Sequence, residues 1–146
     1  MTDTLEIRLA TSNDRDACAN LLRMLTEATG SAWETNLSAF DALVDQSRGA
    51  LFVADRAGEL LGLASISFNL ALRYDGEYCQ LEELVVAPDA RGLNLGAGLM
   101  EATLAAARAR GCKDYGLYLI ESTEKNQPFY EKFGFERVGS EMRQPL

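Results

Sequence analysis

Histidine is absent from the 146 residues of the chain, and this absence removes whole classes of mechanism. Without an imidazole there is no Ser-His-Asp or Cys-His nucleophile and no histidine-ligated metal. Any proton transfer must therefore be carried out by carboxylates, tyrosines, lysines or cysteines. Nothing in the composition requires a metal, and we expect a function that uses none.

Cysteine is also scarce. Cys18, Cys79 and Cys112 are odd in number, widely spaced and set among apolar residues, which predicts reduced, buried thiols in a cytoplasmic protein, none of them catalytic. The chain has no basic start followed by an apolar stretch, and no apolar run approaches the roughly 18–20 residues that cross a bilayer. We therefore expect a soluble protein that binds no membrane.

Positive charge is in short supply, with 14 lysines and arginines against 22 acidic residues and a formal net charge of −8. This balance argues against nucleic-acid binding, which needs a basic patch. An acidic surface favours a cationic amine as substrate, although acidic surfaces mainly confer solubility. The length is that of one domain, which we place at residues 1–146.

Apolar periodicity and turn residues predict ten elements in the order β-α-α-β-β-β-α-β-α-β, which belong to one mixed α/β domain. A period of two indicates strands, and a period of 3.6 between capping and terminating residues indicates helices. The predicted strands cover residues 5–10, 50–55, 59–72, 77–87, 113–120 and 135–142, and the predicted helices cover residues 12–29, 34–46, 95–109 and 128–132.

A glycine-bearing loop joins the strand at residues 77–87 to the long helix. Gly92, Gly96 and Gly98 let an anion approach backbone N–H groups at the helix start, and Arg91 adds a positive charge. The loop lacks the Lys-Ser/Thr ending of a nucleoside-triphosphate loop and the setting of a dinucleotide fold. It therefore indicates a nucleotide other than ATP or NAD, and the alternative is a turn without a ligand.

Two motifs resemble those of the GNAT superfamily of N-acetyltransferases. Val86-x-Pro88-x-x-Arg91-Gly92-x-x-x-Gly96 is similar to its acyl-CoA signature, and the Phe-Tyr-Glu-Lys-Phe-Gly-Phe run at residues 129–135 resembles its closing motif. The resemblance implies a single, mostly antiparallel mixed sheet flanked by helices, with acetyl-CoA as co-substrate. It also implies that the loop's N–H groups hold the pyrophosphate, and that the preceding strand splays from its neighbour to pair with the pantetheine arm.

The resemblance assigns cofactor contacts along this strand and loop and in the closing motif. Asn94 departs from the signature, because a glycine is expected there; asparagine tolerates a positive φ, so the loop can keep its shape. Asn126 is either a cofactor contact or the N-cap of the helix before Pro128. The assigned contacts are Leu84, Val85, Val86, Arg91, Gly92, Leu93, Asn94, Leu95, Gly96, Ala97, Asn126 and Tyr130.

Three residues are candidates for proton transfer. By resemblance, Tyr130 lies near the CoA sulfur, where a phenol can protonate the departing thiolate. Glu82 and Glu83 precede the loop, and because strand neighbours face opposite sides, we expect only one of them to face the reaction cleft. Glu82 is the preferred base, because its spacing from Arg91 resembles that of the base in polyamine-acetylating members.

We thus expect direct transfer of an acetyl group from acetyl-CoA to a primary amine of a small molecule or peptide. The alternatives are a noncatalytic acyl-CoA-binding or sensor domain of the same fold and a structural interaction domain. A homodimer is possible. The acceptor site has no motif to identify it, and we place it near Trp33, Phe40, Phe68 and Tyr74.

Overall fold

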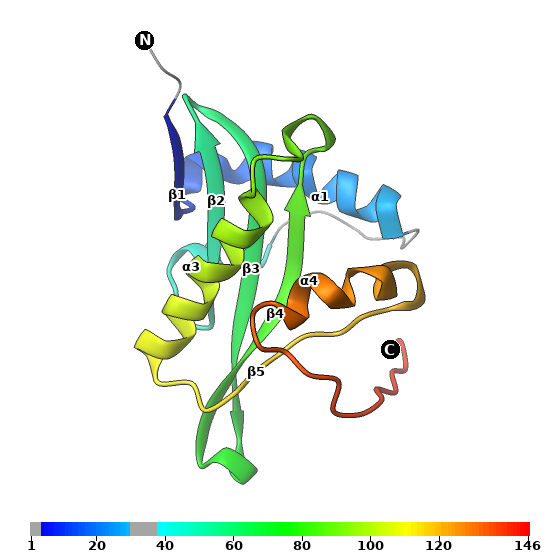
Figure 1. Cartoon of the computed structure of the whole chain (residues 1–146). Helices are drawn as coiled ribbons and strands as arrows, with labels where there is room; N and C mark the ends of the chain where they lie inside the picture. Colours follow the sequence, from blue (N-terminus) through cyan, green and yellow to red (C-terminus); the bar gives the residue numbers. More distant parts are fainter. Residues whose placement is uncertain (1–3, 30–37) are drawn as a thin grey trace.

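The fold is centred on one five-stranded sheet. The computed structural model describes residues 4–29 and 38–146 (Figure 1). The strands follow chain order across the sheet, as β1 (Leu5–Leu9), β2 (Gly49–Arg56), β3 (Glu59–Ala71), β4 (Gly76–Val86) and β5 (Tyr115–Gly116). Neighbours from β1 to β4 are antiparallel, and β5 runs parallel to β4. The predicted mixed, mostly antiparallel sheet is confirmed.

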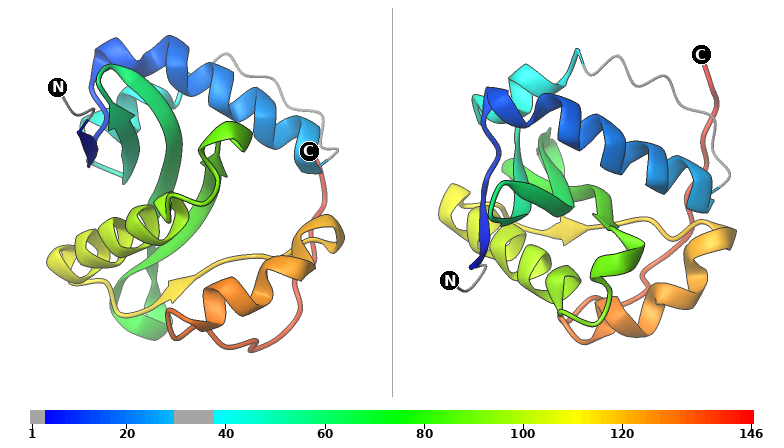
Figure 2. Two further views of the ribbon diagram at one scale, coloured as in Figure 1. Left: turned by 45° about the horizontal axis from the view of Figure 1, so that its top comes forward. Right: turned by 90° about the horizontal axis from the view of Figure 1, so that it is seen from above.

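Helices cover both faces of this sheet (Figure 2). On one side lie α1 (Arg15–Thr29) and the short α2 (Phe40–Val44), and on the other lie α3 (Leu95–Arg110) and α4 (Gln127–Glu131). Single 3₁₀ turns at Ser12–Asp14, Leu72–Tyr74, Pro88–Ala90 and Glu121–Asn126 link these elements. None of the helices among residues 4–29 and 38–146 is long and apolar enough to cross a membrane.

Alternating side chains give the sheet two apolar faces. Cys18 and Leu21 of α1 share a buried cluster with Leu61, Leu63 and Val85 of the sheet. On the opposite face, α3 packs over the sheet through a second cluster that includes Leu99, Met100, Ala64, Ile66, Cys79 and Leu81. Burial of both faces explains why β2 and β3 have long apolar sequences with little polar alternation.

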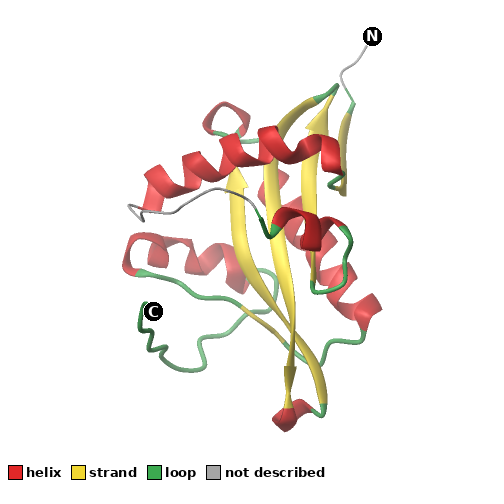
Figure 3. Ribbon diagram, turned by 180° about the vertical axis from the view of Figure 1, so that it is seen from behind, coloured by secondary structure: helices red, strands yellow, loops and turns green. Residues whose placement is uncertain are grey.

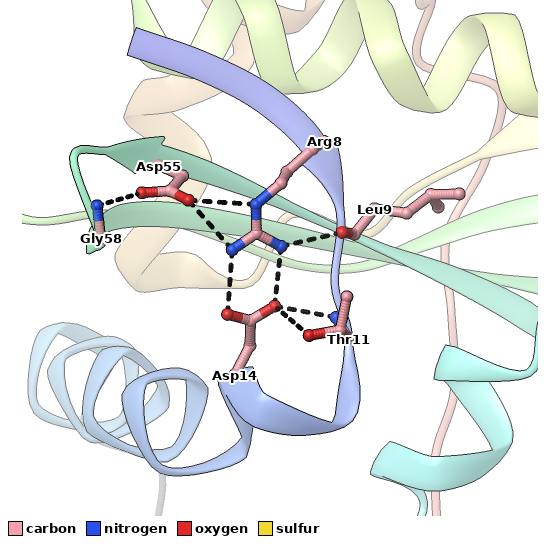
Figure 4. Close-up of polar contacts among 6 residues, drawn as sticks. All are labelled: Arg8, Leu9, Thr11, Asp14, Asp55 and Gly58. Atoms are coloured by element: carbon pink, nitrogen blue, oxygen red, sulfur yellow. Dashed lines mark hydrogen bonds and ion pairs between the residues drawn. The ribbon is translucent and has the colours of Figure 1, made fainter. Parts of the chain in front are cut away.

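An ion-pair network fixes the start of the chain to the sheet (Figure 4). The Arg8 guanidinium donates to both oxygens of Asp14, at 2.8 and 3.0 Å, and to Asp55 of β2 at 3.1 Å. The Thr11 amide donates to the same Asp14 carboxylate at 2.8 Å. The Arg8 hydrogen bonds hold the pKa of Asp14 below its ordinary value. The network thus joins β1, the turn before α1 and β2.

The structure departs from the predicted elements at three places. The strand predicted at residues 113–120 pairs with β4 only at Tyr115 and Gly116. The strand predicted at residues 135–142 is wrong for this chain, because the segment after α4 forms no strand (Figure 3). Alternation of side chains describes a strand but does not supply the neighbouring strand that it must pair with. Of the helix predicted at residues 34–46, only Phe40–Val44 is observed, and residues 34–37 lie outside the described part.

Candidate active site

A β-bulge in β4 sets the orientation of the two candidate bases. Ser65 of β3 pairs with Glu83, whereas the next residue, Ile66, pairs with Leu81, so Glu82 is an extra residue with no partner on β3. A bulge of this kind interrupts the regular alternation of side chains. Glu82 and Glu83 consequently both bond serines of β3, namely Ser67 and Ser65, which lie two residues apart on one face.

The expectation that Glu82 and Glu83 lie on opposite sides of the strand is therefore wrong. It assumed an unbroken strand, and the inserted residue turns neighbouring side chains to the same side. This face is the one that packs against α1, because Leu63 and Val85 on it share the cluster with α1 residues. Two carboxylates thus lie together beneath α1.

The two carboxylates differ in their surroundings. Glu83 is half-buried; it accepts a short hydrogen bond from the Ser65 hydroxyl, and its own amide donates to that hydroxyl at 3.1 Å. Burial raises the pKa of Glu83, and the nearby charge of Glu82 raises it further, although the Ser65 bond opposes both effects. Glu82 is exposed and accepts from Ser67 Oγ at 2.6 Å.

Strand β4 loses its neighbour on one side immediately before the bulge. It pairs with β5 only at Cys79 and Gln80, opposite Tyr115 and Gly116, and the chain after β5 diverges from it (Figure 1). From Leu81 onward, β4 is paired only with β3. This is the splay that the resemblance implied, and it leaves main-chain groups of β4 available to an extended ligand.

The glycine-bearing loop borders a small cavity of about 290 Å³ at the start of α3. Arg91 and Lys132 both line it, and neither makes an ion pair with another residue of the described chain. A helix start, glycines and two unpaired cations form a suitable environment for phosphate groups. The predicted contacts that line the cavity are Val86, Arg91, Gly92, Asn94, Leu95, Gly96 and Ala97; Ala90, Phe129, Lys132 and Phe133 complete it.

Other predicted cofactor contacts lie outside this cavity. Leu84 and Val85 lie on the stretch of β4 that pairs with β3 alone. Leu93 lies in the loop, and its side chain is exposed. Asn126 occupies the N-cap position of α4, but its side chain makes no capping hydrogen bond. Lys132 was missed by the sequence interpretation, although it lies within the closing motif and was the only cation there.

The loop depends on two backbone positions with positive φ. Gly92 has φ 92°, and Asn94 has φ 56° and ψ 29°, in the left-handed region. The prediction that asparagine would preserve the loop is confirmed. A Cβ on Gly96 would lie 3.3 Å from Cζ of Phe129, so the absence of a side chain allows the loop and the closing motif to pack closely.

Tyr130 of α4 has a packed ring and an unpaired hydroxyl. Its ring contacts those of Phe129 and Phe135 edge-on, with centroids 5.1 and 6.2 Å away. No hydrogen bond to the described residues involves its Oη, and no side-chain polar atom among them is both buried and unpaired. The hydroxyl is therefore accessible to solvent or to a ligand. Burial of the side chain raises its pKa, so the phenol stays protonated at neutral pH.

Tyr115 is a second half-buried tyrosine, but its hydroxyl already makes a hydrogen bond. It lies 2.8 Å from Thr103 Oγ1 of α3, and burial raises its pKa strongly. The thiols are also unsuitable for catalysis, because burial raises the pKa of Cys18 and of Cys79 to about 12 and raises that of the half-buried Cys112.

Three of the aromatic residues expected near the acceptor have other roles. Phe40 is buried in the α1 cluster, Phe68 lies under the Arg110 guanidinium, 4.4 Å from its ring centroid, and the Tyr74 hydroxyl donates to Asp114 at 2.8 Å. Trp33 lies outside the described residues. Each of these three side chains thus has a contact within the chain that explains its position.

Comparison with known proteins agrees with this geometry. Residues 17–135 match the acetyltransferase (GNAT) family. A glucosamine 6-phosphate N-acetyltransferase of Trypanosoma brucei brucei is 31% identical over 156 aligned positions that cover 100% of both chains. The crystal structure of a Trypanosoma brucei acetyltransferase, 28% identical, superposes with a TM-score of 0.80 over 98% of this chain and 100% of that one.

A likeness in fold extends to more distant enzymes. An aminoglycoside N-acetyltransferase solved in complex with CoA is 18% identical and superposes with a TM-score of 0.82, over 100% of this chain and 97% of the other. The chain described here therefore belongs to the acetyltransferase (GNAT) family and is an N-acetyltransferase.

Proposed function

We propose that this enzyme transfers an acetyl group directly from acetyl-CoA to the primary amine of a small molecule, using a carboxylate of β4 and Tyr130 for proton transfer. The observation that carries the proposal is the bulge at Glu82, which presents two carboxylates where β4 loses its neighbour β5, five residues before the glycine-bearing loop begins at Ala87. An amine, a thioester and proton-transfer groups can meet at that point.

The residues around the loop fit the anionic part of the co-substrate. Arg91 and Lys132 supply positive charge, and the backbone at Gly92, Asn94 and Gly96 leaves room for phosphates to approach. The pantetheine arm of the co-substrate would bind to main-chain groups of Leu84, Val85 and Val86, on the edge of β4 that has no neighbouring strand. When bound, acetyl-CoA supplies an acyl group activated as a thioester.

Glu83 is the better supported of the two candidate bases. A general base works best when its pKa lies near the working pH, and burial raises the pKa of Glu83 towards that range. Glu82 is exposed beside it, and its negative charge contributes to that shift. In this proposal Glu82 attracts the cationic acceptor, and Glu83 takes a proton from its nitrogen, directly or through water, so that the neutral amine can attack the thioester carbonyl.

Tyr130 acts as the acid at the other end of the reaction. As the C–N bond forms and the C–S bond breaks, the thiolate needs a proton, and the accessible Tyr130 Oη holds one at neutral pH. No thiol takes part, because burial keeps the three cysteines protonated. Transfer is therefore direct, with no acetyl-enzyme intermediate.

For the acceptor we propose glucosamine 6-phosphate as the first candidate. The relative that carries this name is 31% identical and matches along the whole of both chains. The net charge of −8 favours a second candidate, a polycationic amine such as a polyamine or an aminoglycoside, because a field of this sign attracts cations and repels phosphates.

The test is the release of free thiol from acetyl-CoA in the presence of glucosamine 6-phosphate, glucosamine, spermidine and an aminoglycoside. The first candidate predicts the highest kcat/KM for the phosphorylated sugar, and glucosamine is its matched control. A preference for spermidine or the aminoglycoside would reject the sugar phosphate in favour of the second candidate. Thiol release with none of these amines above the rate without an acceptor would reject both.

A further inference from the structure

Ser65 places a hydroxyl in an apolar part of strand β3. It is 2% exposed, and every other residue of the buried run 61–66 has an apolar side chain or none. A buried hydroxyl costs free energy unless it is hydrogen-bonded, and alanine would occupy the same place without that cost. The other buried polar residues among those described, Asp14 and Thr103, bond Arg8 and Tyr115. Ser65 instead bonds Glu83, the proposed base.

The Ser65 hydroxyl bonds Glu83 in both directions. The two residues lie opposite each other in the register of β3 and β4. The Glu83 amide donates to Ser65 Oγ at 3.1 Å, and Oγ donates its one hydrogen to Glu83 Oε1. Because the same oxygen accepts from the main chain of the residue to which it donates, the direction of its hydrogen is fixed. One carboxylate oxygen is thus held against β3.

The second carboxylate oxygen of Glu83, Oε2, is accessible. It makes no hydrogen bond or ion pair with the residues that the structure describes. No side-chain oxygen among those residues is both buried and unpaired, so Oε2 is not enclosed. Oε2 is therefore the atom of Glu83 that can take a proton from an incoming amine, since the Ser65 hydroxyl already occupies Oε1.

Few charges surround this carboxylate. The face of α1 that packs on this side of the sheet is apolar, and consists of Cys18, Leu21, Leu22 and Leu25. The charged residues of α1 are exposed or pair with Asp41; they are Arg15, Asp16, Arg23 and Glu27. Strand β3 presents the hydroxyls of Ser65 and Ser67. In the described part of the chain, Glu82 is thus the charged group that acts on Glu83.

We infer that Ser65 is a positioning residue for the proposed base, because it holds Oε1 of Glu83, directs Oε2 to the amine and sets the pH range in which the carboxylate is ionised. The inference rests on the proposed role of Glu83. Burial raises the pKa of Glu83, the Ser65 hydrogen bond lowers it, and the charge of Glu82 raises it. Without the Ser65 bond, the carboxylate would lose its proton only at a higher pH.

The pH profile of S65A tests this role. The rise of kcat/KM with pH should move upward by about half to one pH unit relative to the parent enzyme, because a hydrogen bond to the charged form is lost. Above this rise, kcat should be about tenfold lower, since a carboxylate that can rotate is aligned less of the time. The assay is thiol release with whichever of the four amines above gives the highest kcat/KM, and the titration of the amine itself is common to all variants.

Two further variants separate positioning from packing. S65T keeps the hydroxyl and should restore the parent profile, whereas S67A removes the hydroxyl that bonds Glu82 and should leave the pH of the rise unchanged. If Ser65 only fills space in the sheet, S65A will alter stability and leave the profile where it is in the parent. That result, or an equal shift in S67A, overturns the inference.

A carboxyl ¹³C NMR titration measures the Ser65 effect without catalysis. The Glu83 signal is identified by its absence in Glu83→Gln, and in S65A it should titrate at a higher pH than in the parent chain. Titration at the same pH in both proteins overturns the inference, also where S65T fails to fold. A kcat/KM rise that persists in Glu83→Gln would instead refute Glu83 as the base, so the two failures are distinguishable.

Discussion

Replacing Tyr130 by phenylalanine separates proton donation from packing. The substitution removes one hydroxyl and keeps the ring that lies edge-on to Phe129 and Phe135. Because this hydroxyl makes no hydrogen bond in the described structure, its removal breaks no intramolecular contact. The free energy of unfolding should therefore change by less than about 0.5 kcal/mol, as for a substitution away from any bonded group.

The catalytic rate should change far more. Loss of a general acid lowers the rate by roughly 10²- to 10⁴-fold, which corresponds to about 2.7 to 5.5 kcal/mol of activation free energy. The loss should appear in kcat more than in KM, since the proton is needed in the transition state. The assay is continuous detection of the free thiol at saturating acceptor, with acetyl-CoA affinity measured separately by calorimetry.

Tyr115→Phe is the matched control. It also removes one phenol hydroxyl, but that hydroxyl bonds Thr103 at 2.8 Å, so its loss should reduce stability by about 0.5–1.5 kcal/mol and leave kcat within a few fold. The two variants thus have opposite expected profiles. If Tyr130→Phe kept more than about half of the parent kcat, well outside the range for a lost acid, solvent must protonate the thiolate and the role of Tyr130 would be packing alone.

Three further predictions test the site and the fold. In the parent enzyme, kcat/KM should rise with pH around the pKa of Glu83, which lies above the ordinary 4.5, and Glu83→Gln should remove this rise. The same substitution should stabilise the protein at pH 7, because burial disfavours the charged carboxylate. If the rise persists in Glu83→Gln but is lost in Glu82→Gln, then Glu82 is the base. Asn94→Gly should leave acetyl-CoA affinity within about threefold, whereas Asn94→Val should destabilise the protein by about 1 kcal/mol or more, since φ is 56°. Asp14→Ala should lower the free energy of unfolding by about 1.5–3 kcal/mol at pH 7 through its bonds to Arg8. Because the pKa of Asp14 is lowered by folding, that difference should disappear as the pH falls below its ordinary 3.8, and a pH-independent difference in urea titrations would refute the ion-pair explanation.

The parts of the fold that the sequence predicted best are those set by local chemistry. Gly58 follows a turn residue at positive φ, and Gly111 ends α3 at φ 84°, both in the backbone conformation that glycine adopts most readily. Asn94 of the glycine-bearing loop likewise adopts the positive φ that the sequence predicted for it. These features depend on one or two residues each, so a single sequence contains the information needed to predict them.

The features that sequence interpretation missed depend on pairs of distant segments. The bulge at Glu82 arises from the register of β4 against β3, some 15 residues away, and period-two reasoning assigned the two acids to opposite faces. The predicted last strand at residues 135–142 has a suitable pattern but no neighbouring strand within its own chain. Side-chain patterns report which residues prefer an extended backbone, whereas partners and register are properties of the whole sheet.

The bulge at Glu82 lies where the free main-chain edge of β4 begins, so this edge and the two carboxylates occur together. A bulged strand bends and twists more strongly than its neighbours, and β4 stops pairing with β5 at Gln80, two residues before the inserted Glu82. The same extra residue therefore accounts for a free main-chain edge on one side of β4 and for a pair of carboxylates on the face below α1. A strand in regular register would turn one acid to the opposite face. A local irregularity in the sheet, rather than any special residue type, thus brings the proposed acyl-donor edge and the proposed base to the same few residues.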